Sequence, residues 1–362
     1  MKYIIPHDSI ILCNKYNEEQ FDATKVGLII RDMNINKRDM WELEIHVTDN
    51  CNLKCKNCSY ASRRNNSSLN PEKLNKTILE AINRKVHTIF ISGGGEPSVW
   101  EGWNEFFKHK SEYSEVSWGI ATNGLNIERN IGKHINFFSL YQIHLLGYDK
   151  TSVIREAGVD CFVKMDESLK YLLRNKSSDT QVTLKFLLNK ETLCEVQNYL
   201  DYIYELSPDV IIMKLTQDYL HHENMFESKE YTSILKIIDN HKISEKFSVR
   251  HNSLNRSVFD NLSVPKKCWV TELGLYYLIR GNGDIYPCVT ASYENENRLG
   301  NIYLNSLDDV ILNTKERKLL TQKMKLKKCP LGACRHYRFS KLIDKYQNNQ
   351  LEITAKTQSL LL

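Results

Sequence analysis

The sequence predicts an α/β protein, with a partial (β/α)6 TIM-like barrel followed by a small C-terminal metal-binding domain. From residue 41 onward, apolar β-branched runs alternate with amphipathic stretches, as expected for βα units around a parallel sheet. Three cysteines follow the first of these runs, and four more lie beyond residue 263. A chain of 362 residues has room for one large domain and an appendage.

Six apolar runs are the expected strands of the barrel, and amphipathic stretches between them are the expected helices. The clearest helix start is at Pro71, because Asn70 supplies an N-cap and proline favours the first helical position. The strands are expected at 41–48, 87–92, 116–122, 138–145, 182–188 and 210–215. The helices are expected at 71–84, 100–110, 127–134, 164–174 and 192–206.

The chain divides into five expected segments. In the first, two apolar runs at 3–12 and 26–31 are expected to pair as a small hairpin. The segments are an N-terminal extension at 1–40, the barrel at 41–220, a helical linker at 221–262, an auxiliary domain at 263–345 and a tail at 346–362.

Composition sets limits on location and partners. Forty-nine Lys and Arg against 44 Asp and Glu give a net charge of +5, too mild to imply nucleic acid or an anionic membrane. The apolar start of the chain is broken by Pro6, His7 and Asp8, so it is neither a secretory signal nor a membrane span. We therefore expect a cytoplasmic protein. Its ten cysteines then favour metal or redox chemistry over disulfides.

The first cysteine group consists of Cys51, Cys55 and Cys58, at the spacing Cys-x3-Cys-x2-Cys. A 4Fe-4S cubane is usually bound by four cysteines, so three close thiols would hold a cubane with one iron left open. An open metal position is where a substrate or cofactor binds. A zinc knuckle or three unrelated core cysteines are the alternatives, although no further Cys or His follows locally to complete a tetrahedral zinc site.

This spacing, with Tyr60 two residues beyond Cys58, resembles the signature of radical S-adenosylmethionine (radical SAM) enzymes, in which SAM chelates the open iron. The resemblance implies that the protein cleaves SAM reductively to methionine and a 5'-deoxyadenosyl radical, which abstracts a hydrogen atom from substrate. It also implies that the cofactor carries the difficult chemistry, while the protein orients substrate and excludes water.

Two further segments follow expected strands and strengthen the resemblance. Gly93, Gly94, Gly95 and Glu96, with a proline next, resemble the GGEP motif that binds the methionyl amino group of SAM. Asn123 lies in a segment that resembles the family's Thr-Asn-Gly motif. The carboxyl ends of parallel strands meet at one rim, so both segments are expected near the cysteines. A tight βα turn and an ordinary Asn-Gly turn are the alternatives.

Three polar residues on later strands are weaker candidates for SAM contacts. His144, Lys185 and Asn189 occupy places where relatives contact the SAM carboxylate, ribose or adenine. A solvated or core role is the alternative for each.

The C-terminal domain is organised around the segment Gly281 to Asp284, a strong hairpin signal between the apolar runs 275–279 and 285–289. Four thiols accompany it, enough for a second, fully ligated 4Fe-4S cluster. The arrangement resembles the SPASM/twitch extension of radical SAM enzymes, and the absence of cysteines after the fourth favours the twitch form with one auxiliary cluster. A structural zinc site is the alternative, because spacing does not separate the two metals. The four are Cys268, Cys288, Cys329 and Cys334.

The resemblance implies an oxidoreductase-like enzyme but does not name its substrate. We expect oxidation, crosslinking or epimerisation of a ribosomally made peptide. A dehydrogenase or epimerase of a sugar or aminocyclitol is the alternative, and a non-catalytic iron-sulfur or zinc scaffold protein is an alternative of another class. The scaffold leaves the Gly-Gly-Glu-Pro segment without a purpose.

The expected chemistry requires partners. A one-electron reductant such as flavodoxin or ferredoxin is implied. A separate precursor-binding protein is a further possibility, because forty residues before the first strand are too few for a winged-helix domain.

Two other features remain. Cys161 is considered as a hydrogen-atom donor, although buried inert cysteine is commoner. Basic residues near the last cysteines are expected to form a solvated face or to attract an acidic peptide. RNA is not expected as a partner, because no aromatic side chains on which bases could stack are interleaved with these charges. They are Lys323, Lys325, Lys327, Lys328, Arg335, Arg338 and Lys341.

Overall fold

The computed structural model describes residues 9–14, 40–58, 60–61, 65–215, 228–251, 268–289, 291–312 and 340. They belong to two compact units, each described by itself. Residues 35–181 and 269–329 form the cysteine-loop unit, and residues 1–34, 182–268 and 330–362 form the second unit. In the described parts, no helix is both long and apolar enough to cross a bilayer.

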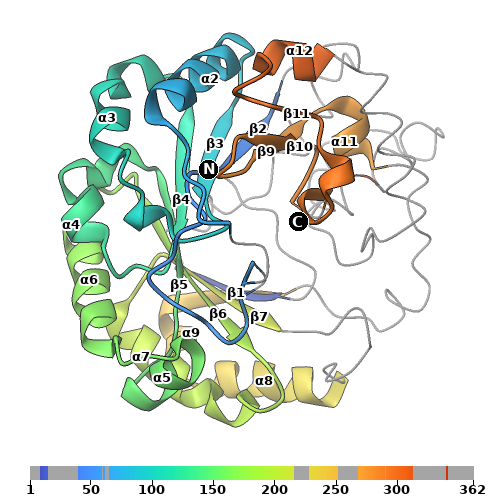
Figure 1. Cartoon of the computed structure of the whole chain (residues 1–362). Helices are drawn as coiled ribbons and strands as arrows, with labels where there is room; N and C mark the ends of the chain where they lie inside the picture. Colours follow the sequence, from blue (N-terminus) through green and yellow to red (C-terminus); the bar gives the residue numbers. More distant parts are fainter. Residues whose placement is uncertain are drawn as a thin grey trace. The chain divides into compact units, whose positions relative to one another are not determined.

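The cysteine-loop unit contains a mostly parallel sheet with helices on its outer face (Figure 1). The chain runs through neighbouring parallel strands in order, as βα units require. The strands are β2 (Glu42–His46), β3 (Thr88–Ser92), β4 (Ser117–Thr122) and β5 (Leu140–His144). The helices are α2 (Pro71–Asn83), α3 (Trp103–Lys108), α4 (Ile127–Ile131), α5 (Lys150–Ala157) and α6 (Phe162–Asn175).

Aromatic side chains fill the space between α3 and the sheet. Trp103, Phe106 and Phe107 on one face of α3 are all buried, and Phe106 meets the Trp118 ring of β4 edge to face at 5.4 Å between ring centroids. Aromatic rings bury large areas and favour this geometry. The cluster therefore fixes the helix layer on the sheet that carries the site.

The C-terminal hairpin extends the same sheet. Strand β9 (Tyr276–Ile279) pairs in parallel with β2, with Glu42 opposite Tyr276, and β10 (Asp284–Tyr286) pairs antiparallel with β9. A short strand β11 (Gly300–Asn301) and helix α12 (Leu307–Leu312) follow. Glu80 of α2 accepts a 2.6 Å hydrogen bond from the Leu307 backbone, so α12 is also attached to the barrel helices.

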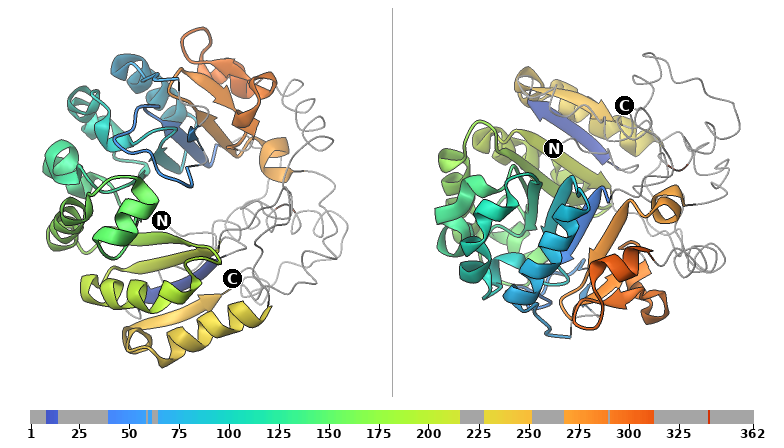
Figure 2. Two further views of the ribbon diagram at one scale, coloured as in Figure 1. Left: turned by 60° about the horizontal axis from the view of Figure 1, so that its bottom comes forward. Right: turned by 90° about the horizontal axis from the view of Figure 1, so that it is seen from above.

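The second unit contains four strands in the order β6-β7-β1-β8. Strands β6 (Gln181–Leu188) and β7 (Val210–Leu215) are parallel, and α7 (Val196–Leu206) lies between them in the chain. Strand β1 (Ser9–Asn14) is antiparallel to both β7 and β8 (Phe247–His251); it is the dark-blue strand of Figure 2. Helices α8 (Ser228–Asn240) and α9 (Ile243–Lys246) precede β8.

The structure confirms the expected α/β class and all six expected strands, with bounds shifted by three residues or fewer. Three details differ. Both edges of β1 are occupied by β7 and β8, so 9–14 does not pair in a hairpin with 26–31, a run outside the described residues. The expected linker contains strand β8 as well as helix. Helix α5 was not expected, because its short sequence has a weak apolar period.

Candidate active site

The cysteine loop joins β2 to α2 and carries Cys51, Cys55 and Cys58, all partly exposed. A turn between the last two is closed by a 3.3 Å hydrogen bond from the Cys58 backbone N–H to the Cys55 carbonyl. Leu53 is 4 % exposed and anchors the loop in the core. Three thiols are thus held near the surface by one buried side chain and the loop's own backbone.

Backbone hydrogen bonds lock the cysteine loop onto the glycine segment that follows β3. The Glu96 N–H donates to the Asn50 carbonyl at 2.7 Å, and the Gly95 N–H donates to the Thr48 carbonyl at 3.0 Å. Buried backbone groups need such partners. The expectation that the loops after the first two barrel strands meet at one rim is therefore met.

Two of the glycines are required by close contact between these loops. A Cβ atom on Gly94 would lie 2.0 Å from Oδ1 of Asp49, and one on Gly95 would lie 2.0 Å from the Asn50 carbonyl oxygen. No side chain fits at such distances. The glycines hence allow the backbone just before Cys51 to pack on the segment, whereas their contact with SAM remains a prediction.

Glu96 is buried and acts as a hub between strands. Its carboxylate accepts hydrogen bonds from the Asn123 N–H at 2.7 Å, from the Ser98 N–H at 2.8 Å and from the Thr122 hydroxyl. Burial raises the pKa of Glu96, and these three donors oppose that shift. Glu96 thus fixes the end of β4 against the glycine segment.

Asn123 connects the end of β4 to the cysteine loop. Its side-chain amide donates to the Asn52 side-chain oxygen at 2.8 Å, one residue after Cys51. Its own side-chain oxygen accepts from the Leu125 N–H at 3.1 Å, as in an ordinary Asx turn. Both the turn and the contact with the loop are present, so Asn123 positions the cysteine loop.

A buried polar network lies on β2 beneath the loop. Glu44 accepts hydrogen bonds from the Ser92 hydroxyl and the Tyr276 hydroxyl, both at 2.6 Å, and its Oε1 lies 3.4 Å from Nε2 of His46. Nδ1 of His46 is buried and has no hydrogen-bond partner among the described residues. The Tyr60 ring packs edge-on against His46, 5.2 Å between ring centroids.

An ion pair links the cysteine loop to the C-terminal domain. Nη2 of Arg280 lies 3.8 Å from Oδ1 of Asp49, and both side chains are almost fully buried. Nη1 of Arg280 donates to the Ser292 carbonyl at 3.4 Å, in the turn that follows Cys288. One guanidinium therefore contacts the segments that adjoin the two groups of cysteines.

Sequence analysis did not identify Glu44, His46, Asp49 or Arg280. Glu44 and His46 alternate with Leu43 and Ile45 in a strand whose residues are nearly all buried. Polar residues at every second position of a buried strand were the available signal. The Asp49 to Arg280 pair had no such signal, because 231 positions of sequence separate its partners.

The four weaker candidates, one cysteine and three polar residues, lie on β5, on or just after β6, and at the start of α6. Burial raises the pKa of the Cys161 thiol, which lies at the start of α6, and neighbouring Asp160 adds to the shift. His144 ends β5 and is partly exposed. Asn189 bonds within its own turn, accepting from the Thr192 N–H at 2.9 Å, and Lys185 lies on β6 in the second unit.

The auxiliary cysteines are described only in part. Cys268 and Cys288 are partly exposed, and the Cys288 sulfur accepts a 3.2 Å hydrogen bond from the Ala291 N–H. Cys329, Cys334 and the basic residues around them lie outside the described residues. In the described ranges, no three His, Cys, Asp or Glu side chains form a site for a single metal ion.

The residues of the cysteine loop fit the cofactors expected there. Three thiols in one loop are the donor set of an iron-sulfur cluster with one open iron. Close by, the buried Nδ1 of His46 lies about 3.9 Å from the Cβ position of Gly94 and lacks a partner among the described atoms. Cys51, Cys55 and Cys58 would hold the cluster, and the glycine segment would bind SAM beside it.

Comparison with known proteins agrees with this geometry. Residues 45–203 match the model of the radical SAM superfamily, and residues 268–336 match the SPASM iron-sulfur cluster-binding domain. No curated protein sequence matches the chain.

Two examples illustrate the solved structures that share the fold. SuiB of Streptococcus suis, bound to its precursor peptide SuiA, has a TM-score of 0.60 and 16% identity over 90% of this chain and 75% of SuiB. Native anSMEcpe, with bound AdoMet and Cp18Cys peptide, has a TM-score of 0.57 and 17% identity over 84% of this chain and 96% of that one.

The partial barrel and its cysteine loop define an enzyme of one-electron SAM chemistry. Residues 45–203 form a radical SAM domain, and residues 268–336 form a SPASM iron-sulfur domain. Its cofactors are accordingly SAM, a 4Fe-4S cluster and auxiliary iron-sulfur.

Proposed function

We propose that this enzyme modifies a ribosomally made peptide by abstracting a hydrogen atom from it. The observation that carries the proposal is the locking of the cysteine loop onto the glycine segment through the Glu96 to Asn50 hydrogen bond. Similar folds belong to SuiB, crystallised with the precursor peptide SuiA, and to anSMEcpe, crystallised with the Cp18Cys peptide. These two proteins support a peptide substrate over a sugar or aminocyclitol.

When bound, the cluster and SAM together supply one-electron cleavage of the sulfonium and a radical able to abstract hydrogen. The chain's own residues hold that chemistry in place. Asn123 and Glu96 fix the glycine segment and the cysteine loop relative to each other. Buried His46 offers a ring nitrogen on the inner side of the loop, where water is excluded.

Oxidation or crosslinking of a peptide also needs an acceptor for the electron left on the substrate. In this proposal, Cys268, Cys288, Cys329 and Cys334 would hold one auxiliary 4Fe-4S cluster, which would supply that acceptor. Arg280 supports the role, because it contacts both the turn after Cys288 and Asp49 of the cysteine loop. An external one-electron reductant and a separate precursor-binding protein belong to the same proposal.

Deuterium transfer is the decisive experiment. Reconstituted, reduced enzyme is incubated with SAM and with deuterated peptides encoded beside the gene, and 5'-deoxyadenosine is analysed by mass spectrometry. We expect deuterium in 5'-deoxyadenosine with a peptide. Deuterated sugars and aminocyclitols are tested in parallel, and transfer from one of these alone would replace the peptide with a small molecule. Failure to form any 5'-deoxyadenosine would favour a non-catalytic scaffold.

A further inference from the structure

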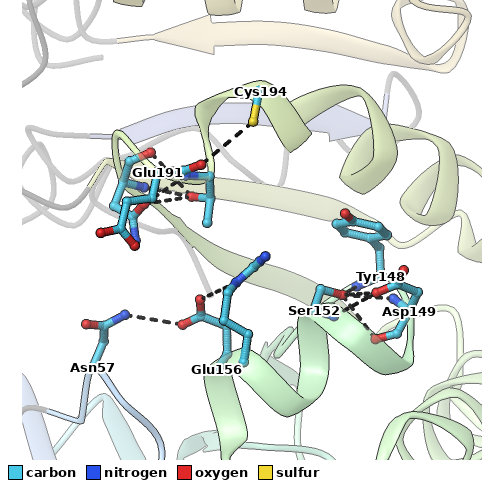
Figure 3. Close-up of polar contacts among 10 residues, drawn as sticks. Asn57, Tyr148, Asp149, Ser152, Glu156, Glu191 and Cys194 are labelled. Carbon is cyan, nitrogen blue, oxygen red and sulfur yellow. Dashed lines mark hydrogen bonds and ion pairs between the residues drawn. The ribbon is translucent and has the colours of Figure 1, made fainter.

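The turn between α5 and α6 lies directly against the cysteine loop. The Lys56 N–H donates to the Glu156 carbonyl at 2.9 Å. The Asn57 side-chain amide donates to the Glu156 carboxylate at 3.2 Å (Figure 3). A Cβ atom on Gly158 would lie 3.8 Å from the Lys54 carbonyl. A protein that covers one of these two segments therefore also meets the other.

Aliphatic side chains are exposed on this turn. Ile154, Val159 and Val163 are 40%, 49% and 65% exposed, and they are three of the five large hydrophobic residues that are exposed among those described. Single exposed aliphatic residues are common, whereas a group of them marks an interaction site. We call these three residues, together with Lys54, Lys56 and Lys164, the α5–α6 patch.

The charge of the patch is positive. Lys54 and Lys56 are exposed on the cysteine loop, and Lys164 is exposed next to Val163 at the start of α6. Of the neighbouring carboxylates, Asp160 lies 2.8 Å from Nζ of Lys150, and Glu156 accepts from Asn57. A third, Glu167, is exposed one turn beyond Val163 on α6. The α5–α6 patch thus combines exposed aliphatic side chains with three exposed lysines, a composition that complements an acidic protein surface.

The patch is also held rigid. Asp149 and Ser152 form a capping box at the start of α5, with 2.7 Å from the Ser152 N–H to the Asp149 carboxylate (Figure 3). Gly158 ends the helix in the left-handed conformation at φ 77°. A rigid surface loses little conformational entropy when a partner binds.

We propose that the α5–α6 patch is the docking surface for an acidic one-electron carrier protein of the flavodoxin type. The inference rests on the proposed function, because SAM cleavage uses one electron from outside per event. That electron would leave the carrier, oxidising it by one electron, and would reduce by one electron the cluster that the cysteine loop would hold. Electron transfer slows steeply with distance, so the carrier has to approach this loop.

The test compares two reductants on the full-length, reconstituted enzyme. Val159→Glu with Val163→Glu adds two negative charges at the patch without changing the cysteine loop. Lys76→Gln with Lys85→Gln is the matched control, because it shifts the net charge equally at exposed positions on and just beyond α2. SAM cleavage is measured with flavodoxin hydroquinone and with dithionite, and flavodoxin affinity is measured directly by fluorescence anisotropy.

We expect the patch variant to lose about tenfold in flavodoxin-driven cleavage and in flavodoxin affinity, since surface charge changes association rates by this order. Its dithionite-driven rate should stay within about twofold of wild type, and the control should match wild type with both reductants. Added salt should weaken wild-type binding. Unchanged flavodoxin affinity in the patch variant, or an equal loss in the control, would overturn the proposal. Absence of dithionite-driven cleavage in wild type would instead refute the proposed function.

Discussion

The Arg280 guanidinium lies 3.8 Å from the Asp49 carboxylate, although 231 positions of sequence separate the two residues. Asp49 precedes Cys51 by two residues, and Arg280 also donates to the Ser292 carbonyl in the turn after Cys288. The pair is buried, so water does not screen it. The two cysteine groups are thereby connected through a single side chain.

Arg280→Met is expected to lower the free energy of unfolding by about 3 kcal/mol, because it leaves the buried Asp49 carboxylate without its cation. Asp49→Asn combined with Arg280→Met should recover part of that loss, since the uncompensated charge is removed. Urea unfolding of the metal-free protein, monitored by circular dichroism, measures the free energy of unfolding of wild type, of each single variant and of the double variant. Additive effects in this double-mutant cycle would show that the two side chains do not interact.

Anaerobically reconstituted wild type is expected to bind about eight irons, on the division of cysteines into three and four. Cys51→Ala with Cys55→Ala and Cys58→Ala should leave about four. Iron analysis and the brown absorption of 4Fe-4S clusters measure the change. Full iron content in the triple variant, or zinc in place of iron in wild type, would contradict the two-cluster assignment.

Gly94→Ala is expected to abolish measurable SAM binding while the protein still folds. A methyl group there would lie 2.0 Å from Asp49, so the segment before Cys51 must move away from the glycine segment. Isothermal titration of reconstituted enzyme with SAM is the measurement. Gly158→Ala is the control. Its added methyl group would lie near only the Lys54 carbonyl oxygen, at 3.8 Å, and the left-handed backbone at this position costs about 1 kcal/mol of strain. Equal SAM affinity in Gly94→Ala and wild type would refute the loop-packing role.

Glu96 is expected to make stability depend on pH. Burial raises its pKa in the folded state above the ordinary value of 4.5, so the folded protein holds this proton more tightly than the unfolded chain. Its contribution to stability is complete below that ordinary value and is lost as pH rises through the raised folded pKa.

Glu96→Gln removes this titration. It also sets an amide donor against the N–H groups of Ser98 and Asn123, at a cost of about 1–3 kcal/mol. The stability difference between wild type and variant should therefore narrow as pH rises through that window. Urea midpoints from about pH 5 to about pH 8 measure it. A constant difference would show that Glu96 does not titrate there.

The two cluster sites are expected to differ in role. Cys268→Ala with Cys288→Ala should still cleave SAM to some extent but lose substrate turnover, whereas Cys55→Ala should abolish both. Metal binding can also stabilise a domain, so circular dichroism and a melting curve accompany the assay. Full turnover with the auxiliary cluster demonstrably absent would exclude its role as electron acceptor.

Local features of the sequence were sufficient to predict the strands of the barrel and the loops after them. The alternation of apolar runs with amphipathic stretches depends on residues close together in the chain, and β2, β3 and β4 form where it indicated. The positions of Cys51 and Gly94 after neighbouring strands predicted that their loops would meet, because parallel strands end at the same rim.

Contacts between distant segments required the tertiary structure. Strand β8 pairs with the edge of β1, which lies more than 200 positions earlier in the chain. The local pattern of apolar residues does not predict such pairing. The same holds for the Tyr276 to Glu44 hydrogen bond, which depends on β9 joining the edge of β2.

The sequence by itself determined the chemistry of this protein: three thiols at a spacing suited to an open cluster, and a glycine segment one βα unit later. Only the tertiary structure decided what those glycines touch, that Glu96 is a buried hub and that Arg280 contacts the loop of Cys51. The physical reason is that covalent spacing places a donor set within one loop. Burial, ion pairing and steric contact depend on segments that meet only after the chain has folded.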